Sequence, residues 1–181
     1  MFEPTPELVQ YINSWGHTYS NLILIPSAVS CVDSESVAFN IAGHHDWGCS
    51  SLLKFSDDHI KKAWGDREDL YFTDSIDVST IRLDSYISAF NKNNPSPIVE
   101  IDYLHIDTQG SDLEVIKSLG DYLPIVKAGQ LEVPDSENVA LYQGQHTEAE
   151  AIYFLYENGF RIVTVLQQQN ERNLVFEKGI E

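Results

Sequence analysis

The sequence has few basic residues. Eleven lysines and arginines stand against 28 aspartates and glutamates, which gives a formal net charge of −17. A negative field of that size repels the phosphates of nucleic acid and of anionic membranes. We therefore expect neither nucleic acid nor a membrane among the partners. The acidic residues are spread along the chain, which is typical of a solvated surface rather than of an acidic tail.

Cysteine is also scarce, and Cys31 and Cys49 lack the spacing of metal ligands. We interpret both as free thiols, as in most cytoplasmic proteins. No apolar run is long enough to cross a bilayer, and the first residues lack the pattern of a secretory signal. We therefore expect a cytoplasmic protein. A chain of 181 residues with 43% hydrophobic content suits one domain over residues 1–181.

The most informative stretch is residues 103–116, which predicts a strand, a tight turn and a helix. Residues 103–106 are mostly apolar, as in a strand that is covered on both faces. Asp107 then lies at the carboxyl end of this strand, and Gly110 allows a sharp turn. Ser111 and Glu114 fit a capping box at the start of the helix. Because ligands of open α/β sheets bind beyond the carboxyl ends of strands, Asp107 is a candidate site residue.

Strand and helix patterns alternate along the rest of the chain. Thr147 and Glu150 form a second potential capping box, and Pro6 suits the first turn of a helix that Gly16 ends. This alternation predicts an α/β fold with a mostly parallel sheet and right-handed crossovers. The last two strands look like an antiparallel hairpin. The expected strands are residues 21–30, 36–42, 76–83, 125–133, 161–166 and 173–176.

Several segments, in order along the chain, resemble the FkbM family of S-adenosylmethionine-dependent methyltransferases. The strongest is residues 104–116 (LHIDTQGSDLEVI), which is similar to the family's Leu-Lys-Ile-Asp-x-Glu/Gln-Gly-x-Glu-x-x-Val-Leu. Residues 2–6 are similar to its Phe-Glu-Pro-x-Pro, and residues 80–84 to its Thr-x-x-Leu-Asp. Glu132 and the turn at residues 157–160 match a later Glu and a Gly-Tyr/Phe turn of the family pattern. The resemblance implies a Rossmann-like class I methyltransferase sheet.

One part of the family pattern is absent from these residues. The family's first strand and its Asp-x-Gly-Ala-Asn loop belong upstream of Phe2, and no Gly-x-Gly occurs in the sequence. We therefore expect the domain to be N-terminally truncated, with an unpaired inner edge along residues 103–107. Because that loop contacts the methionine portion of the cofactor, we also expect residues 1–181 to bind the cofactor weakly or not at all.

The resemblance implies that S-adenosylmethionine is the cofactor and that Glu3, Ser27 and Ala28 contact it. Glu3 follows a strand stub, where a carboxylate can accept both ribose hydroxyls. Its alternative role is to stabilise the start of the following helix through the helix dipole. Ser27 and Ala28 end the next strand, near the expected position of the adenine. An ordinary strand end explains these two residues about as well.

The catalytic candidates are Asp107, His105 and Glu132. Asp107 is the strongest, since transfer to a hydroxyl benefits from a base that takes the proton. It could also orient the acceptor, contact the cofactor's amino group, or accept backbone hydrogen bonds in its own turn. His105 alternates with Asp107 along the strand and could be a base, although a histidine packed in the core or against a helix is the more ordinary interpretation. Glu132 ends the following strand and is expected to face Asp107.

We expect no metal site. The loop residues His44, His45 and Asp46 are too few to hold an ion, and Glu132 with Asp107 gives only two ligands. The resemblance implies instead that this loop, with Ser50 and Ser51, lines the acceptor side.

The expected reaction is methyl transfer to a hydroxyl of a small molecule or glycan. The alternative is a catalytically inactive Rossmann-like remnant that acts as a binding or oligomerisation module. A homo-oligomer is compatible with either function. The missing glycine-rich loop is the feature that separates the two hypotheses.

Overall fold

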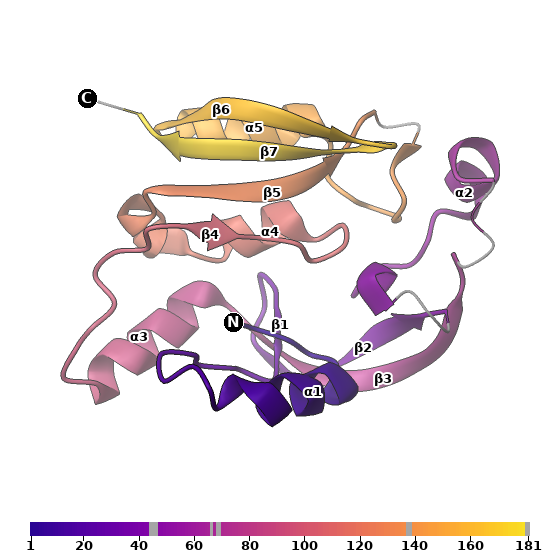
Figure 1. Cartoon of the computed structure of the whole chain (residues 1–181). Coiled ribbons are helices and arrows are strands. Elements are labelled where there is room, and N and C mark those ends of the chain that lie inside the picture. Colours follow the sequence, from indigo (N-terminus) through magenta and orange to yellow (C-terminus); the bar gives the residue numbers. More distant parts are fainter. Residues whose placement is uncertain (44–46, 66, 68–69, 137–138, 180–181) are drawn as a thin grey trace.

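The structure is a computed structural model that describes residues 1–43, 47–65, 67, 70–136 and 139–179. These residues form a mixed α/β structure with two sheets (Figure 1). The elements are α1 (Pro6–Gly16), β1 (Ala28–Val29), β2 (Ser34–Ala42), η1 (Trp47–Cys49), α2 (Asp57–Ala63), β3 (Phe72–Ile81), α3 (Leu83–Asn93), β4 (Leu104–His105), α4 (Asp112–Lys117), η2 (Gly120–Ile125), β5 (Ala128–Pro134), α5 (Glu148–Glu157), β6 (Phe160–Gln168) and β7 (Glu171–Lys178).

The first sheet has three strands in the order β1-β3-β2. β1 runs parallel to β3, and β2 pairs with β3 in antiparallel register. The N-terminal residues make an isolated parallel bridge, between Phe2 and Ile25 just before β1. The strand expected at residues 2–3 is therefore reduced to one bridge residue, Phe2.

The second sheet has four strands in the order β4-β5-β7-β6. β4 is parallel to β5, whereas the β5–β7 and β6–β7 pairs are antiparallel. The predicted C-terminal hairpin is confirmed, and β7 lies inside the sheet between β5 and β6. The helices α4 and α5 pack on one face of this sheet (Figure 1).

The expectation of one mostly parallel sheet needs correction. Two sheets are present, and three of the five strand pairs are antiparallel. Among the described residues, β1 and β4 are both edge strands, so no strand connects the two sheets through their ladders. This arrangement agrees with the expected unpaired edge along residues 103–107.

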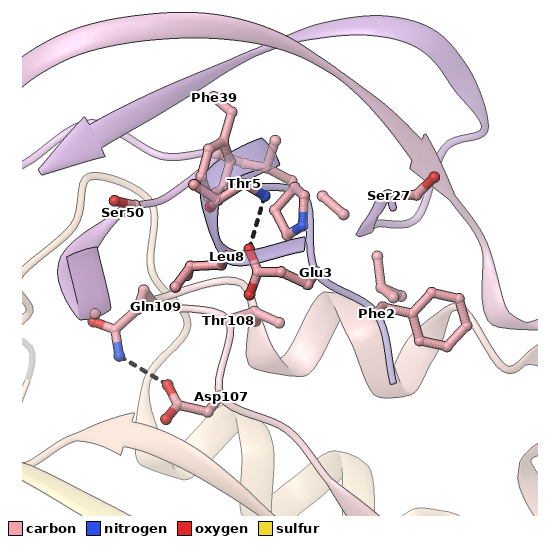
Figure 2. Close-up of a pocket in the computed structure, with 15 residues that line it drawn as sticks. Phe2, Glu3, Thr5, Leu8, Ser27, Phe39, Ser50, Asp107, Thr108 and Gln109 are labelled. Carbon is pink, nitrogen blue, oxygen red and sulfur yellow. Dashed lines mark hydrogen bonds between the residues drawn. The ribbon is translucent and has the colours of Figure 1, made fainter. Parts of the chain in front are cut away.

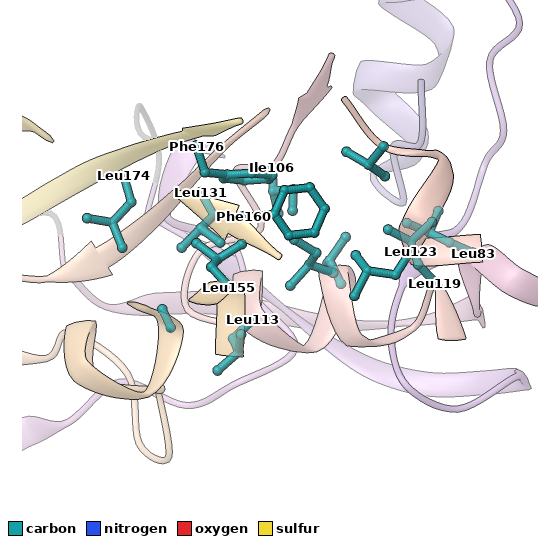
Figure 3. Close-up of a cluster of buried hydrophobic side chains, with 14 of the residues drawn as sticks. Leu83, Ile106, Leu113, Leu119, Leu123, Leu131, Leu155, Phe160, Leu174 and Phe176 are labelled. Atoms are coloured by element: carbon teal, nitrogen blue, oxygen red, sulfur yellow. The ribbon is translucent and has the colours of Figure 1, made fainter. Parts of the chain in front are cut away.

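One hydrophobic core joins the two sheets (Figure 3). It contains Val29 of β1, Leu83 of α3 and Leu131 of β5. Helix α4, which follows the signature turn (residues 107–111), contributes the buried side chains of Leu113, Val115 and Ile116. The core therefore fixes the position of the turn that precedes this helix.

The two predicted capping boxes have different outcomes. The box formed by Thr147 and Glu150 is present at the start of α5. Ser111, by contrast, makes no capping hydrogen bond at the start of α4. Glu114 does not reach back to it, because its carboxylate instead bonds His146 Nε2 at 2.7 Å. The contact between Glu114 and His146 has therefore replaced the contact with Ser111 that a capping box requires.

No helix within the described ranges is both long enough and apolar enough to cross a membrane.

Candidate functional site

A cavity of about 210 Å³ lies where the N-terminal segment and β1 meet the turn after β4 (Figure 2). Glu3, Ser27, Ala28 and Asp107 all line it. Four of the residues singled out from the sequence, separated by up to about a hundred positions, therefore meet at one place. The complete lining is Phe2, Glu3, Pro4, Thr5, Leu8, Ser27, Ala28, Val29, Phe39, Gly48, Ser50, Leu52, Asp107, Thr108 and Gln109.

Glu3 is held at this cavity by the start of α1. Its Oε1 atom accepts a hydrogen bond of 2.7 Å from the backbone N–H of Thr5 (Figure 2). This is the helix-start role considered as the alternative. No hydrogen bond to the second carboxylate oxygen is present among the described residues. The carboxylate is therefore oriented by one oxygen while the other remains able to accept a hydroxyl.

Ser27 and Ala28 form one wall of the same cavity. The Ser27 hydroxyl lies 2.6 Å from the Ser79 hydroxyl of the neighbouring strand. Ala28 and Val29 are buried, and Phe39 adds an aromatic surface nearby. This wall is apolar except for its backbone groups and one hydroxyl, a composition suited to a flat heteroaromatic ring.

Asp107 is oriented by the turn that it begins. Its Oδ1 atom accepts a hydrogen bond of 2.8 Å from the side-chain amide of Gln109. The Gln109 carbonyl Oε1 in turn lies 2.9 Å from the hydroxyl of the buried Tyr142. Gln109 has a positive φ of 54°, which is unusual for a residue with a side chain. Such strained residues gather at functional sites, and this one aims its amide at Asp107.

Gly110 is required at the next position. Its φ is +97°, and a Cβ atom there would lie 2.7 Å from the Tyr142 ring. The sharp turn predicted at this glycine is thus confirmed, with close packing as a second reason for it.

Asp112 ties the turn to β5. Its Oδ2 atom accepts from both the N–H and the hydroxyl of Thr108, and its Oδ1 atom accepts from the N–H of Glu132 at 3.0 Å. Burial raises the pKa of Asp112 to about 6, although these hydrogen bonds oppose the rise. Asp112 therefore fixes the distance between the strand ends that carry Asp107 and Glu132.

A second cavity, of about 460 Å³, adjoins the first. Asp107, Gln109 and Gly48 line both, so the two cavities meet at the signature turn. His105 and Glu132 also line the second cavity, which brings the three catalytic candidates together. The complete lining is Gly48, Cys49, His105, Asp107, Gln109, Gln130, Glu132, Gln168, Glu171 and Asn173.

The strand register explains this polar lining. His105 pairs with Gln130, and Glu132 pairs with Asn173. Glu171 lies two residues before Asn173 on β7. Residues paired directly, or two apart on one strand, share a face of a sheet, so these side chains point away from the core beneath α4 and α5.

The two glutamates of this cavity hold protons more tightly than usual. Burial, followed by the charges of Glu171, Asp107 and Asp112, raises the pKa of Glu132 to about 8. Burial and the charges of Asp107 and Asp112 raise the pKa of Glu171 to about 7, while Arg67 opposes the rise. Glu132 is therefore mainly protonated at neutral pH in the ligand-free protein. It is a poorer general base there than an ionised carboxylate.

His105 is not packed in the core or against a helix, so the more ordinary interpretation of this residue is wrong. Its side chain is exposed, and its Nε2 atom lies 2.9 Å from the amide nitrogen of Gln130. The amide oxygen of Gln130 accepts from Tyr103 at 3.0 Å. His105 is thus oriented along the edge of the second cavity.

The loop that precedes Leu52 contributes in two ways. Ser50 lines the first cavity and accepts from the N–H of Ala42 at 3.0 Å. Ser51 is fully buried, and its hydroxyl donates to the backbone carbonyl of Gln109 at 2.6 Å, which supports the strained turn. The residues considered as metal ligands, His44, His45 and Asp46, lie outside the described residues. Within the described ranges, no three His, Cys, Asp or Glu side chains are grouped to hold a metal.

Sequence reasoning missed four residues of the site: Gln109, Tyr142, Glu171 and Asn173. Gln109 was part of the recognised signature, but nothing local indicates its positive φ. Glu171 and Asn173 could have been found from the hairpin, because the register of β7 against β5 places them beside Glu132. For Tyr142 no sequence signal exists.

Comparison with protein families gives a match that covers most of the chain. The family described as Methyltransferase FkbM domain matches residues 1–162. Comparisons with curated proteins and with solved structures found no match. The matched range includes both capping segments, the signature turn, Glu3 and Glu132. The chain therefore belongs to the FkbM family of methyltransferases.

Proposed function

We propose that this domain is an S-adenosylmethionine-dependent methyltransferase of Rossmann-like class I type, which transfers the methyl group to a hydroxyl of a small molecule or glycan. The observation that carries the proposal is the meeting of the two cavities at Asp107. Transfer of a methyl group needs donor and acceptor in line with each other. Two adjoining cavities with a shared carboxylate suit that requirement.

The first cavity fits the adenosine part of the cofactor. One carboxylate oxygen of Glu3 bonds the N–H of Thr5, and the other can accept hydrogen bonds from the ribose hydroxyls. The wall formed by Ser27, Ala28 and Val29 suits the adenine ring. Glu3 directly follows the parallel bridge between Phe2 and Ile25, and Ala28 and Val29 form β1, which is parallel to β3. Nucleotides bind near the ends of parallel strands in α/β sheets. When bound, S-adenosylmethionine supplies an electrophilic methyl group on sulfur.

The second cavity fits the acceptor. Asp107 is fixed by Gln109 and faces both cavities, so it can accept the proton of an acceptor hydroxyl as the oxygen attacks the methyl group. With the cofactor bound as methyl donor, the carboxylate of Asp107 would hold the proton that the acceptor hydroxyl releases. His105 lies on the same rim and can relay that proton to solvent.

A binding measurement tests the cofactor assignment. Because the sequence has no Gly-x-Gly loop for the methionine portion, we expect weak binding. At high ligand concentration, S-adenosylhomocysteine should nevertheless shift the backbone NMR signals of Ser27, Ala28 and Thr108 in a saturable way. Glu3→Gln should weaken this binding about tenfold, because an amide is a poorer acceptor for two ribose hydroxyls than a carboxylate. The exposed Glu7→Gln, four positions further on and outside both cavities, is the matched control and should leave the affinity unchanged.

Two results would contradict the assignment. One is the absence of saturable shifts around the first cavity. The other is an equal loss of affinity in Glu3→Gln and Glu7→Gln, which would point to a general charge effect.

A further inference from the structure

The second cavity contains two buried polar side chains that have no hydrogen-bond partner among the described residues. Glu132 is 9% exposed, and Asn173 beside it on β7 is 8% exposed. Both line the cavity, so their carboxylate and amide groups border its interior. Neither side chain makes a hydrogen bond among the described residues, so a ligand in the cavity can bind their polar atoms without displacing an existing partner.

A third unpaired group lies next to them. The Oε1 atom of Glu171 is buried and has no hydrogen-bond partner. Glu171 and Glu132 are close enough for the charge of one to act on the other. Two carboxylates that lack donors are therefore held side by side on the face of β5 and β7.

The charges of the side chains that line this cavity determine which ligands it can bind. Asp107, Glu132 and Glu171 line this cavity, whereas no lysine or arginine of the described chain does. Arg67, whose charge acts on Glu171, is not part of the lining. An anionic acceptor, such as a phosphorylated or sulfated sugar, would be repelled. A cation with several N–H donors would be attracted by both glutamates.

We propose that the acceptor carries a protonated amine beside its hydroxyl groups, as in an amino sugar, and that the ammonium group lies between Glu132 and Glu171. The inference rests on the proposed methyltransferase function, because it names the acceptor of that same site. The Asn173 amide can donate to and accept from a neighbouring hydroxyl. A divalent metal suits the cavity less well, since no group of three ligands is present in the described ranges.

The protonation of the two glutamates, and its expected change when an ammonium group binds, supports the proposal. Asp107, Asp112 and Glu171 disfavour ionisation of Glu132, and His105 also lines the cavity. An ammonium group between the glutamates favours their charged forms and lowers their pKa values. Binding at pH 7 should therefore release protons. Calorimetry in two buffers of different ionisation enthalpy measures that release.

Glucosamine and glucose provide a matched pair of probes, which differ in the ammonium or hydroxyl group at one carbon. In NMR titrations at pH 7 we expect glucosamine to shift the signals of Glu132 and Asn173, with an affinity about tenfold or more above that of glucose. Glu132→Gln and, independently, Glu171→Gln should remove this preference. The exposed Glu35→Gln should keep it.

Equal binding of the two sugars would overturn the inference, as would a preference that survives in both Glu132→Gln and Glu171→Gln. S-adenosylhomocysteine binding, followed in the same samples at Ser27 and Ala28, tests the cofactor assignment separately. Absence of an amine preference in the wild-type protein, with intact cofactor binding, thus refutes the acceptor class alone. Absent cofactor binding refutes the proposed function.

Discussion

Replacement of Asp107 by asparagine is expected to reduce methyl transfer about 100-fold to 10,000-fold, the range typical for loss of a general base. Asparagine keeps the oxygen that accepts the Gln109 hydrogen bond, so the turn should retain its shape. It cannot take the proton of an acceptor hydroxyl. The fall should therefore appear in kcat, with the affinity for S-adenosylhomocysteine nearly unchanged. The measurement is turnover with any acceptor that the wild-type protein methylates.

The control for this variant is Asp121→Asn. Asp121 is exposed and lies outside both cavities, so its loss should leave turnover at the wild-type level. If Asp107→Asn turned over as fast as wild type, the proton would leave by another route and the assignment of Asp107 as base would be wrong.

The stability of the protein is expected to fall as the pH rises from about 5 to about 8. Glu132 has an ordinary pKa of 4.5, which burial and the neighbouring carboxylates raise to about 8 in the folded state. The folded protein therefore binds this proton more tightly than the unfolded chain does. Its stabilising contribution is complete below the unfolded pKa and is lost as the pH rises through the folded pKa. With about 1.4 kcal/mol for each pKa unit, the loss is about 2–5 kcal/mol.

Glu132→Gln removes that titration and should be more stable than wild type at pH 9, with a flatter dependence of the melting temperature on pH. Glu35→Gln, which changes an exposed carboxylate, should follow the wild-type curve. Thermal unfolding from pH 5 to pH 9 provides the comparison. A constant difference in melting temperature between Glu132→Gln and wild type across this range would show that Glu132 does not titrate abnormally.

Local signals in the sequence predicted local structure well. The capping residues Thr147 and Glu150 form their box, although His146 Nδ1 also lies 3.5 Å from the Glu150 carboxylate. Glu114 had the same local pattern, but His146 and Lys117 bind its carboxylate instead. β3 begins at Phe72 rather than near Ile76, since its polar first residues become strand only by pairing with β2. The errors thus arise where a long-range contact decides the outcome.

The same contrast between local sequence patterns and long-range contacts applies to the candidate site. Asp107 could be identified because it follows a predicted apolar strand, and Glu132 because it lies near the end of the next one. Their closeness depends on Asp112, which joins the signature turn to β5 through three hydrogen bonds. Glu171 reaches the cavity only through the register of β7 within the sheet. No local pattern encodes these distances, so the acidic character of the second cavity could not be predicted.

A crystal structure of the protein with S-adenosylhomocysteine tests the central claim most directly, namely that donor and acceptor cavities meet at Asp107. We predict the adenine against Ser27 and Ala28, the ribose hydroxyls on Glu3, and the sulfur directed toward the carboxylate of Asp107. The second cavity should remain open beside it. Adenosine bound elsewhere, or a sulfur directed away from Asp107, would contradict the account.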